Sequence, residues 1–189
     1  MKHGRRAWVL VLALGALACI TILLSGDRGH DVNTLGEAAI AAFAEGKFEL
    51  YEPYTPAGLD GDARLRLMCG DDEIDAKCRA RHARAMEAAV AERDRFAAAF
   101  DDAVNLAKTA GFDWRGASLV SVDTSGVQTT PPRIGSEVES SGRLLVHGQS
   151  PKGGPFVLEL TGCAKITWRG WLCAIPRWRP GPKTEGPKP

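Results

Sequence analysis

Cysteine is the residue type in this chain with the clearest capacity for covalent chemistry. Four cysteines lie beyond the N-terminal apolar segment: Cys69, Cys78, Cys163 and Cys173. Their even number and the short separation within each consecutive pair favour two disulfides, Cys69 with Cys78 and Cys163 with Cys173, while the other two connectivities stay open. Each bond would close a loop of about ten residues and contribute about 2–3 kcal/mol.

A zinc site is the alternative use of the first cysteine pair. Cys78 and His82 are spaced i, i+4, and Cys69 could add a third ligand. Structural zinc sites have four ligands and usually a Cys-x-x-Cys pair, and neither a fourth ligand nor that pair is evident in the sequence. We therefore favour disulfides and predict no metal or cofactor.

An apolar run over residues 7–24 follows Lys2, Arg5 and Arg6. As a helix it would reach about 27 Å, close to the roughly 30 Å hydrocarbon core of a bilayer. The sequence thus predicts a single-pass transmembrane helix, a signal-anchor within residues 1–26. The positive-inside rule would leave the N-terminus in the cytoplasm and the C-terminal domain periplasmic or extracellular.

Two processing routes compete with that anchor. A peptidase could cut before Cys19, or Cys19 could be lipidated as in bacterial lipoproteins. Either route, like the anchor, would export the remainder of the chain. The expected localisation is therefore the cytoplasmic membrane, with the C-terminal domain periplasmic or extracellular.

Two helices are expected in the first half of the exported part. Thr34 and Glu37 form a capping-box pattern that predicts a helix over 34–45. A longer amphipathic helix is predicted over 73–109, with Phe96 and Phe100 buried against a sheet. Between the two, residues 48–59 are expected to form a helical turn and loop, and a further helical turn begins near residue 62.

Strands are expected after Gly111, because the apolar residues change to an alternating pattern. Their predicted segments are 118–124, 142–150, 155–166 and 171–178. The short connections favour antiparallel pairing, with a loop over 129–141. The last hairpin would turn near Trp168, Arg169 and Gly170, which would bring Cys163 and Cys173 together.

These elements fit one exported domain over residues 27–178, followed by a disordered Pro-rich tail over 179–189. Residues 27–102 carry 10 basic and 17 acidic side chains, and residues 103–189 carry 11 and 6. The basic excess of the second part is scattered and is not interleaved with aromatics in a continuous run. We therefore expect no nucleic-acid partner.

Three stretches in this order resemble a known family: "AEGKFELYEPYTP", "AGFDWRGASLVSV" and "FVLELTGCAKITWRGWLCAIPRW". The chain resembles the NTF2-like, cystatin-type fold of small bacterial envelope proteins, in which a Gly-Trp such as Gly170 and Trp171 is often found near the closing turn. The resemblance implies an α+β class, with helices packed on one face of a curved antiparallel sheet. Its motifs are loose patterns, so it indicates a fold more than a function.

Enzymes of that family place an Asp and a His, or an Asp and an Arg, inside the cone of the sheet. The matching residues here would be Asp123 and His147, without any nucleophile elbow, HExxH, P-loop or GxGxxG motif. A lone histidine on a strand is usually a surface or satisfied residue. We therefore assign no catalytic residue.

The last hairpin is rich in Trp and Arg, which are common where proteins bind partners. We expect core packing for Trp171 and assign Trp168 and Arg169 as a possible partner contact. The first hypothesis is a membrane-anchored, non-enzymatic domain that binds an envelope protein, as an accessory, inhibitor or immunity-type factor. The alternative is an NTF2-like enzyme or small-ligand-binding protein that uses the concave sheet pocket, and the interior of that pocket discriminates between them.

Overall fold

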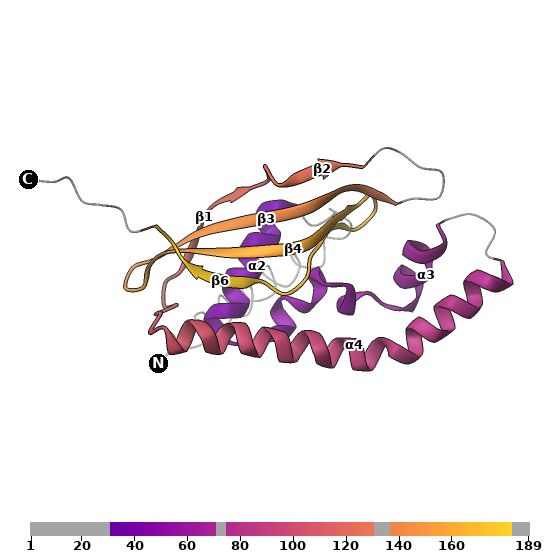
Figure 1. Ribbon diagram of the computed structural model, residues 1–189, viewed down its shortest axis with the longest axis horizontal. Helices are drawn as coiled ribbons and strands as arrows, with labels where there is room; N and C mark the ends of the chain where they lie inside the picture. Colours follow the sequence, from indigo (N-terminus) through magenta and orange to yellow (C-terminus); the bar gives the residue numbers. More distant parts are fainter. Residues whose placement is uncertain (1–30, 71–74, 131–136, 183–189) are drawn as a thin grey trace, which may run out of the picture.

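A computed structural model describes residues 31–70, 75–130 and 137–182 of the chain. The helical elements come first and the strands second (Figure 1). The helices are α2 (Val32–Glu45), α3 (Gly61–Cys69) and α4 (Ala76–Thr109), and three 3₁₀ turns, η1 (Phe48–Leu50), η2 (Glu52–Tyr54) and η3 (Pro56–Gly58), join α2 to α3. The strands are β1 (Ser118–Asp123), β2 (Val127–Thr129), β3 (Val138–Ser150), β4 (Gly154–Ile166), β5 (Gly170–Leu172) and β6 (Arg177–Pro180).

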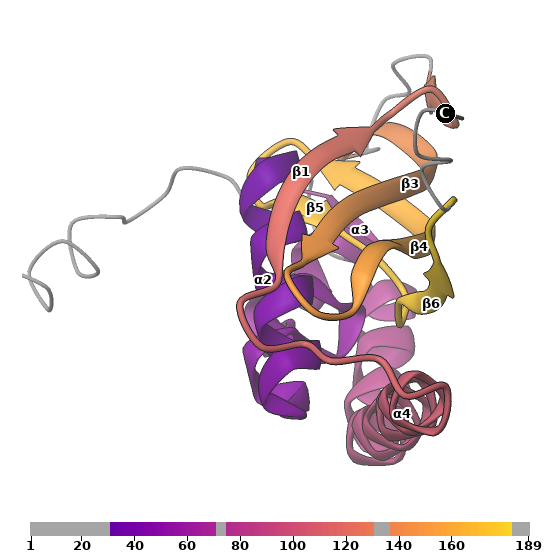
Figure 2. The ribbon, with the colours of Figure 1, turned by 90° about the vertical axis from the view of Figure 1, so that its left-hand side faces the viewer.

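The strands form one antiparallel sheet that curls into a half-barrel. Its order is β1-β3-β4-β5, while β2 also pairs with β3 and β6 also pairs with β4. Figure 2 shows α2 lying within the curve of the sheet and α4 running along its open side. The class is therefore α+β, with the helices on the concave side of the sheet.

Alternation along β3 and β4 directs one set of apolar side chains toward the helices. Leu144 and Val146 of β3 are fully buried, and so is Leu158, the partner of Val146 on β4. Helix α2 can lie close to this face because Gly36 has no Cβ. A Cβ at Gly36 would come within 3.1 Å of Val122 and 3.2 Å of Leu119.

Two helix starts differ from the sequence prediction, and aspartate caps explain both. The carboxylate of Asp31 accepts hydrogen bonds from the backbone N–H groups of Asn33 and Thr34, so α2 begins before the expected capping box. Asp75 accepts from the backbone N–H of Cys78, and α4 therefore begins at Ala76 rather than at residue 73. Gly46 ends α2 with φ 65°, as its position predicts.

The strand boundaries differ most at the C-terminal end. The single strand expected over 171–178 is divided into β5 and β6 by residues 173–176, where Pro176 has no backbone N–H to donate. In one continuous strand Trp171 and Trp178, seven residues apart, would face opposite sides of the sheet. Because residues 173–176 interrupt the strand, both side chains join the main core. Strand β2 lies in a segment for which the sequence predicts no strand, and β6 includes Arg179 and Pro180, which the sequence pattern places in the tail.

The fold class predicted from the sequence needs one correction. It included a transmembrane helix, but among the described residues no helix is long and apolar enough to cross a membrane. Helix α4 has 34 residues, yet charged side chains recur along its whole length. The segment for which the transmembrane helix was predicted, residues 1–26, lies outside the described residues.

Candidate functional site

Both cysteine pairs predicted from the sequence form disulfides. Cys69 and Cys78 join the end of α3 to the first turn of α4, with their Cα atoms 6.1 Å apart. Cys163 and Cys173 join β4 to the residue that follows β5, with their Cα atoms 4.0 Å apart. The register explains the second pair, because Ala164 opposes Leu172 and the next residues outward are the two cysteines.

The third residue of the zinc alternative has a different contact. A ring nitrogen of His82 lies 2.8 Å from the backbone carbonyl oxygen of Gly61, so His82 links α4 to the start of α3. Among the described residues no group of three or more His, Cys, Asp or Glu side chains is arranged to hold a metal ion. The disulfide and the histidine contact together hold α3 against α4.

The tip of the last hairpin packs against the protein itself. Trp168 is half-buried beside Leu59, Ile166 and Leu172, and the guanidinium of Arg66 lies 4.9 Å from the centre of its ring. Arg169 donates a hydrogen bond to the carbonyl oxygen of Pro53. The tip therefore holds α3 and η2 in place, and a partner contact by Trp168 and Arg169 stays a prediction.

The structure places Asp123 and His147 on the outer face of the sheet. Val122 and Val146 face the helices, so the adjacent residues Asp123 and His147 face away from them. Asp123 accepts a hydrogen bond of 2.7 Å from the backbone N–H of Ser125, and this bond lowers the pKa of the Asp123 carboxyl group. The nearby His147 lowers this pKa further. These two residues are close together but are not inside the concave face.

The concave face itself is filled by apolar side chains. Phe43 of α2 stacks edge-on against Phe100 of α4, with ring centres 5.2 Å apart, and both side chains are 0–1% exposed. Phe156 of β4 lies 4.9 Å from the ring of Trp114 and is equally buried. The expected burial of Phe100 is thus present, and its ring contacts the rings of Phe43 and Phe48. Phe96, for which the sequence predicted the same burial, is only partly buried.

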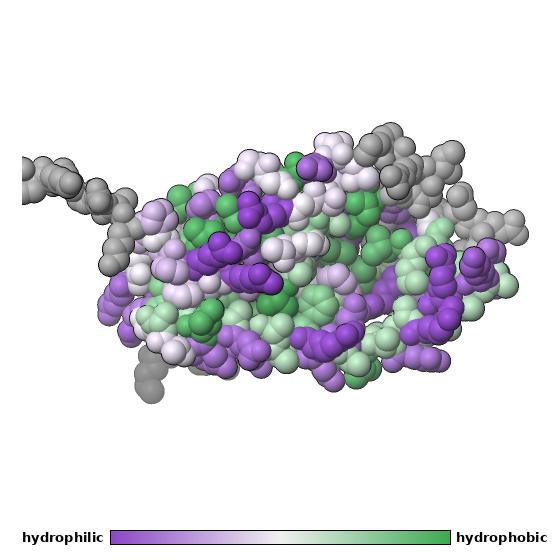
Figure 3. Space-filling view, in the orientation of Figure 1, coloured by the Kyte–Doolittle hydropathy of each residue, from purple (hydrophilic) through white to green (hydrophobic). Residues whose placement is uncertain are grey.

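A depression lies beside this core, between α4 and residues 174–177. It has a volume of about 530 Å³. Figure 3 shows apolar side chains gathered in the band between the sheet and α4. We call this depression the α4 groove; its lining consists of Glu92, Arg95, Phe96, Ala99, Ala103, Thr161, Ala174, Ile175, Pro176 and Arg177.

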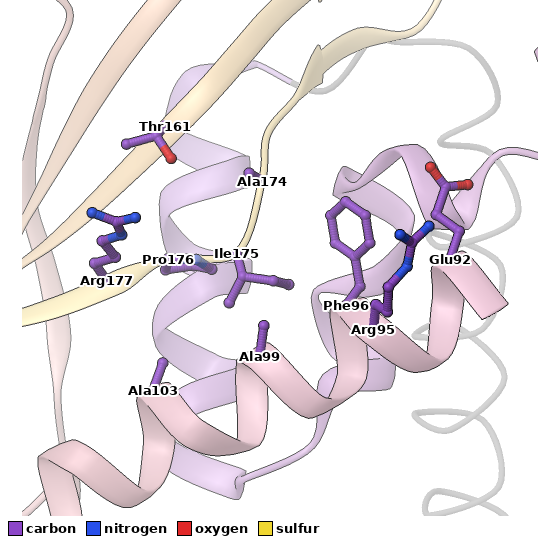
Figure 4. A pocket seen from close by; sticks show the side chains of 10 residues that line it. All are labelled: Glu92, Arg95, Phe96, Ala99, Ala103, Thr161, Ala174, Ile175, Pro176 and Arg177. Atoms are coloured by element: carbon purple, nitrogen blue, oxygen red, sulfur yellow. The ribbon is translucent and has the colours of Figure 1, made fainter.

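Helix periodicity and short side chains create the groove. Phe96, Ala99 and Ala103 are spaced three and four residues apart, so they lie on one face of α4 (Figure 4). Ile175 and Pro176 form the opposite wall. Because alanine is short, space remains between the helix and that wall at Ala99 and Ala103.

The charges around the α4 groove are unbalanced. Glu92 forms an ion pair of 2.7 Å with Arg64, a buried guanidinium that also donates to the carbonyl oxygen of Pro56. Neither Arg95 nor Arg177 forms an ion pair with a carboxylate of another described residue. The groove is therefore apolar along its floor and positive at its rim.

A buried tyrosine fixes the wall of the groove. The hydroxyl of Tyr51 donates a hydrogen bond of 3.1 Å to the carbonyl oxygen of Ala174, and the backbone N–H of Ala174 donates to the carbonyl oxygen of Thr161. The side chain of Tyr51 is fully buried, and this burial raises the pKa of its hydroxyl far above the ordinary value. Burial also raises the pKa of the half-buried Tyr54, with a further contribution from Asp31.

We expect the two tyrosines of the chain to titrate separately. An unfolded chain loses tyrosine protons near pH 10.0, whereas folded Tyr51 keeps its proton, so the folded state binds more protons and stability falls as the pH rises above about 10. Ultraviolet absorbance should therefore show Tyr54 ionising first and Tyr51 ionising only as the chain unfolds. Tyr51→Phe should abolish the second step; simultaneous, reversible ionisation of both would contradict the burial of Tyr51.

The α4 groove was not anticipated from the sequence. Its two walls come from segments about seventy residues apart, and the only local signal was the small-residue spacing of Ala99 and Ala103 on an amphipathic helix. No family model, curated protein or solved structure matches this chain.

Proposed function

We propose that the described domain is a non-enzymatic protein-binding module of an oxidising compartment, an accessory or inhibitor-type factor of the cell envelope. The observation that carries the proposal is the α4 groove, an exposed apolar surface with a positive rim on a domain whose concave face is filled. A groove with an apolar floor that receives an apolar segment of a partner is a recurring mode of protein recognition. The two disulfides support an exported location.

The alternative, an NTF2-like enzyme or small-ligand carrier, receives less support. Such a protein would use convergent polar groups within the sheet, where Phe43, Phe100 and Phe156 lie instead. Asp123 and His147, the matching residues of the family resemblance, face outward. The resemblance to the NTF2-like fold itself is retained as part of the proposal, on the basis of the curved antiparallel sheet with helices on its concave side.

Crosslinking of the tagged full chain in its own cells tests this proposal. Quantitative mass spectrometry should find one crosslinked protein in near-equal amount with the tagged chain. No substrate should need to be added for this protein to be found. Native mass spectrometry of the same preparation is the complementary measurement. A tightly bound small molecule with no protein recovered above background would overturn the proposal in favour of the ligand-binding alternative.

A further inference from the structure

We infer that the α4 groove binds a short peptide segment of a partner protein in which apolar residues are flanked by acidic ones. This inference rests on the proposed protein-binding function and specifies the site and the chemistry of the bound segment. Apolar side chains of the bound segment would fit the floor of the groove, because Phe96, Ala99 and Ile175 are all partly open to solvent. Covering them would remove apolar surface from water.

The rim specifies the charge of the segment. Glu92 is already neutralised by Arg64, so the groove presents Arg95 and Arg177 as its available charges. Figure 4 shows these two arginines at different ends of the groove, with the apolar lining between them. A segment with one acidic residue on each side of an apolar centre matches this order, whereas an amphiphile with one charged head would reach a single arginine.

The groove is also preorganised for such a segment. Tyr51 fixes the carbonyl group of Ala174, and the Cys163–Cys173 disulfide fixes the residue before it. On the other side, Phe100 and Val104 anchor α4 in the core. Both walls are thus held before binding, which lowers the entropy lost when the segment docks.

The probe for a binding test is a fluorescein-labelled peptide, Gly-Asp-Leu-Ile-Leu-Asp-Gly, added to the purified full chain. Fluorescence anisotropy at low salt should show tighter binding of this peptide than of two controls, one with lysines replacing the aspartates and one with serines replacing the apolar residues. Each exposed ion pair should change the affinity about two- to fivefold. High salt should reduce the preference for aspartate over lysine.

Two variants separate the effect of charge from the effect of shape. Arg95→Glu combined with Arg177→Glu should reverse the preference, so that the lysine peptide binds more tightly than the aspartate peptide. Ala99→Trp should block both peptides by filling the groove, and the exposure of Ala99 allows the larger side chain without disturbing the core. Unchanged melting temperatures verify that the variants fold.

Arg84→Gln is the matched control for the arginines. Arg84 and Arg95 are both exposed on α4, and the Nε of each donates to the carbonyl oxygen four residues earlier at 3.3 Å. Arg84 does not line the groove, so its loss should leave the peptide affinity unchanged. An equal effect of Arg84→Gln and Arg95→Gln would show that general charge, rather than the groove, attracts the peptide and would overturn the inference.

Two further outcomes would also overturn it. One is equal binding of the aspartate and lysine peptides; the other is binding of decanoate, blocked by Ala99→Trp, without binding of either peptide, which would assign the groove to a lipid-like ligand. The failure of the wider proposal is distinguishable. If Ala99→Trp leaves the yield of the crosslinked partner unchanged, the partner binds elsewhere, and only the assignment to this groove is lost.

Discussion

Phe100→Ala should lower the free energy of unfolding by about 3–5 kcal/mol, because the substitution leaves a cavity at the centre of the core. The ring of Phe100 is 0% exposed and lies 5.2 Å from that of Phe43 and 5.9 Å from that of Phe48. The loss is a large share of the roughly 5–15 kcal/mol that stabilises an ordinary domain. Guanidinium unfolding followed by tryptophan fluorescence provides the measurement.

Leu106→Ala is the control on the same helix. Leu106 is 58% exposed, so its truncation should change stability by about 0.5 kcal/mol or less. If Phe100→Ala and Leu106→Ala had equal effects, α4 would not present the buried face described above.

Replacing Cys163 and Cys173 together by alanine should cost about 2–3 kcal/mol, because the unfolded chain regains the freedom of the loop that the bond closes. The structure should loosen first near the missing disulfide. Cys173 also donates its backbone N–H to the carbonyl oxygen of Tyr54, so hydrogen exchange should become faster in β5 and in the adjoining wall of the α4 groove. Thermal melting and hydrogen exchange measured on the full chain test both parts.

The pair Cys69→Ala and Cys78→Ala serves as the comparison. Its bond closes a loop of similar length, with a sequence separation of 9 against 10, so the loss of stability should be similar. Faster exchange should then be confined to α3 and the first turns of α4. Peptide mapping of the unreduced protein that joined Cys163 to Cys69 or Cys78 would refute the pairing on which both predictions rest.

Local periodicity accounts for the parts of the fold that the sequence predicted well. The long amphipathic stripe of α4 and the alternation of β1 and β4 each lie within one segment, so their type can be read without knowledge of their neighbours. The pairing of Cys163 with Cys173 followed in the same way, from a turn centred near Trp168. Helix starts differ from the prediction because each depends on which residue caps the helix, and Asp31 and Asp75 are the caps here.

Long-range packing accounts for what the sequence did not predict. From the sequence of its own hairpin, Trp168 would be an exposed residue at the tip. In the structure Arg66, about a hundred residues earlier, covers its ring. The α4 groove likewise exists only where Ala99 and Ala103 meet Ile175 and Pro176. The outward position of Asp123 and His147 depends on which face of the sheet the helices cover, and no local pattern determines that choice.

The two disulfides join cysteines that are neighbours along the chain, Cys69 with Cys78 and Cys163 with Cys173. In the export from the N-terminus that we propose, the first pair would emerge and meet an oxidant before the second pair had left the cytoplasm. Cysteines oxidised in their order of arrival would then be joined in the native pattern. Maturation of this domain should therefore depend on a thiol oxidase and be indifferent to a disulfide isomerase.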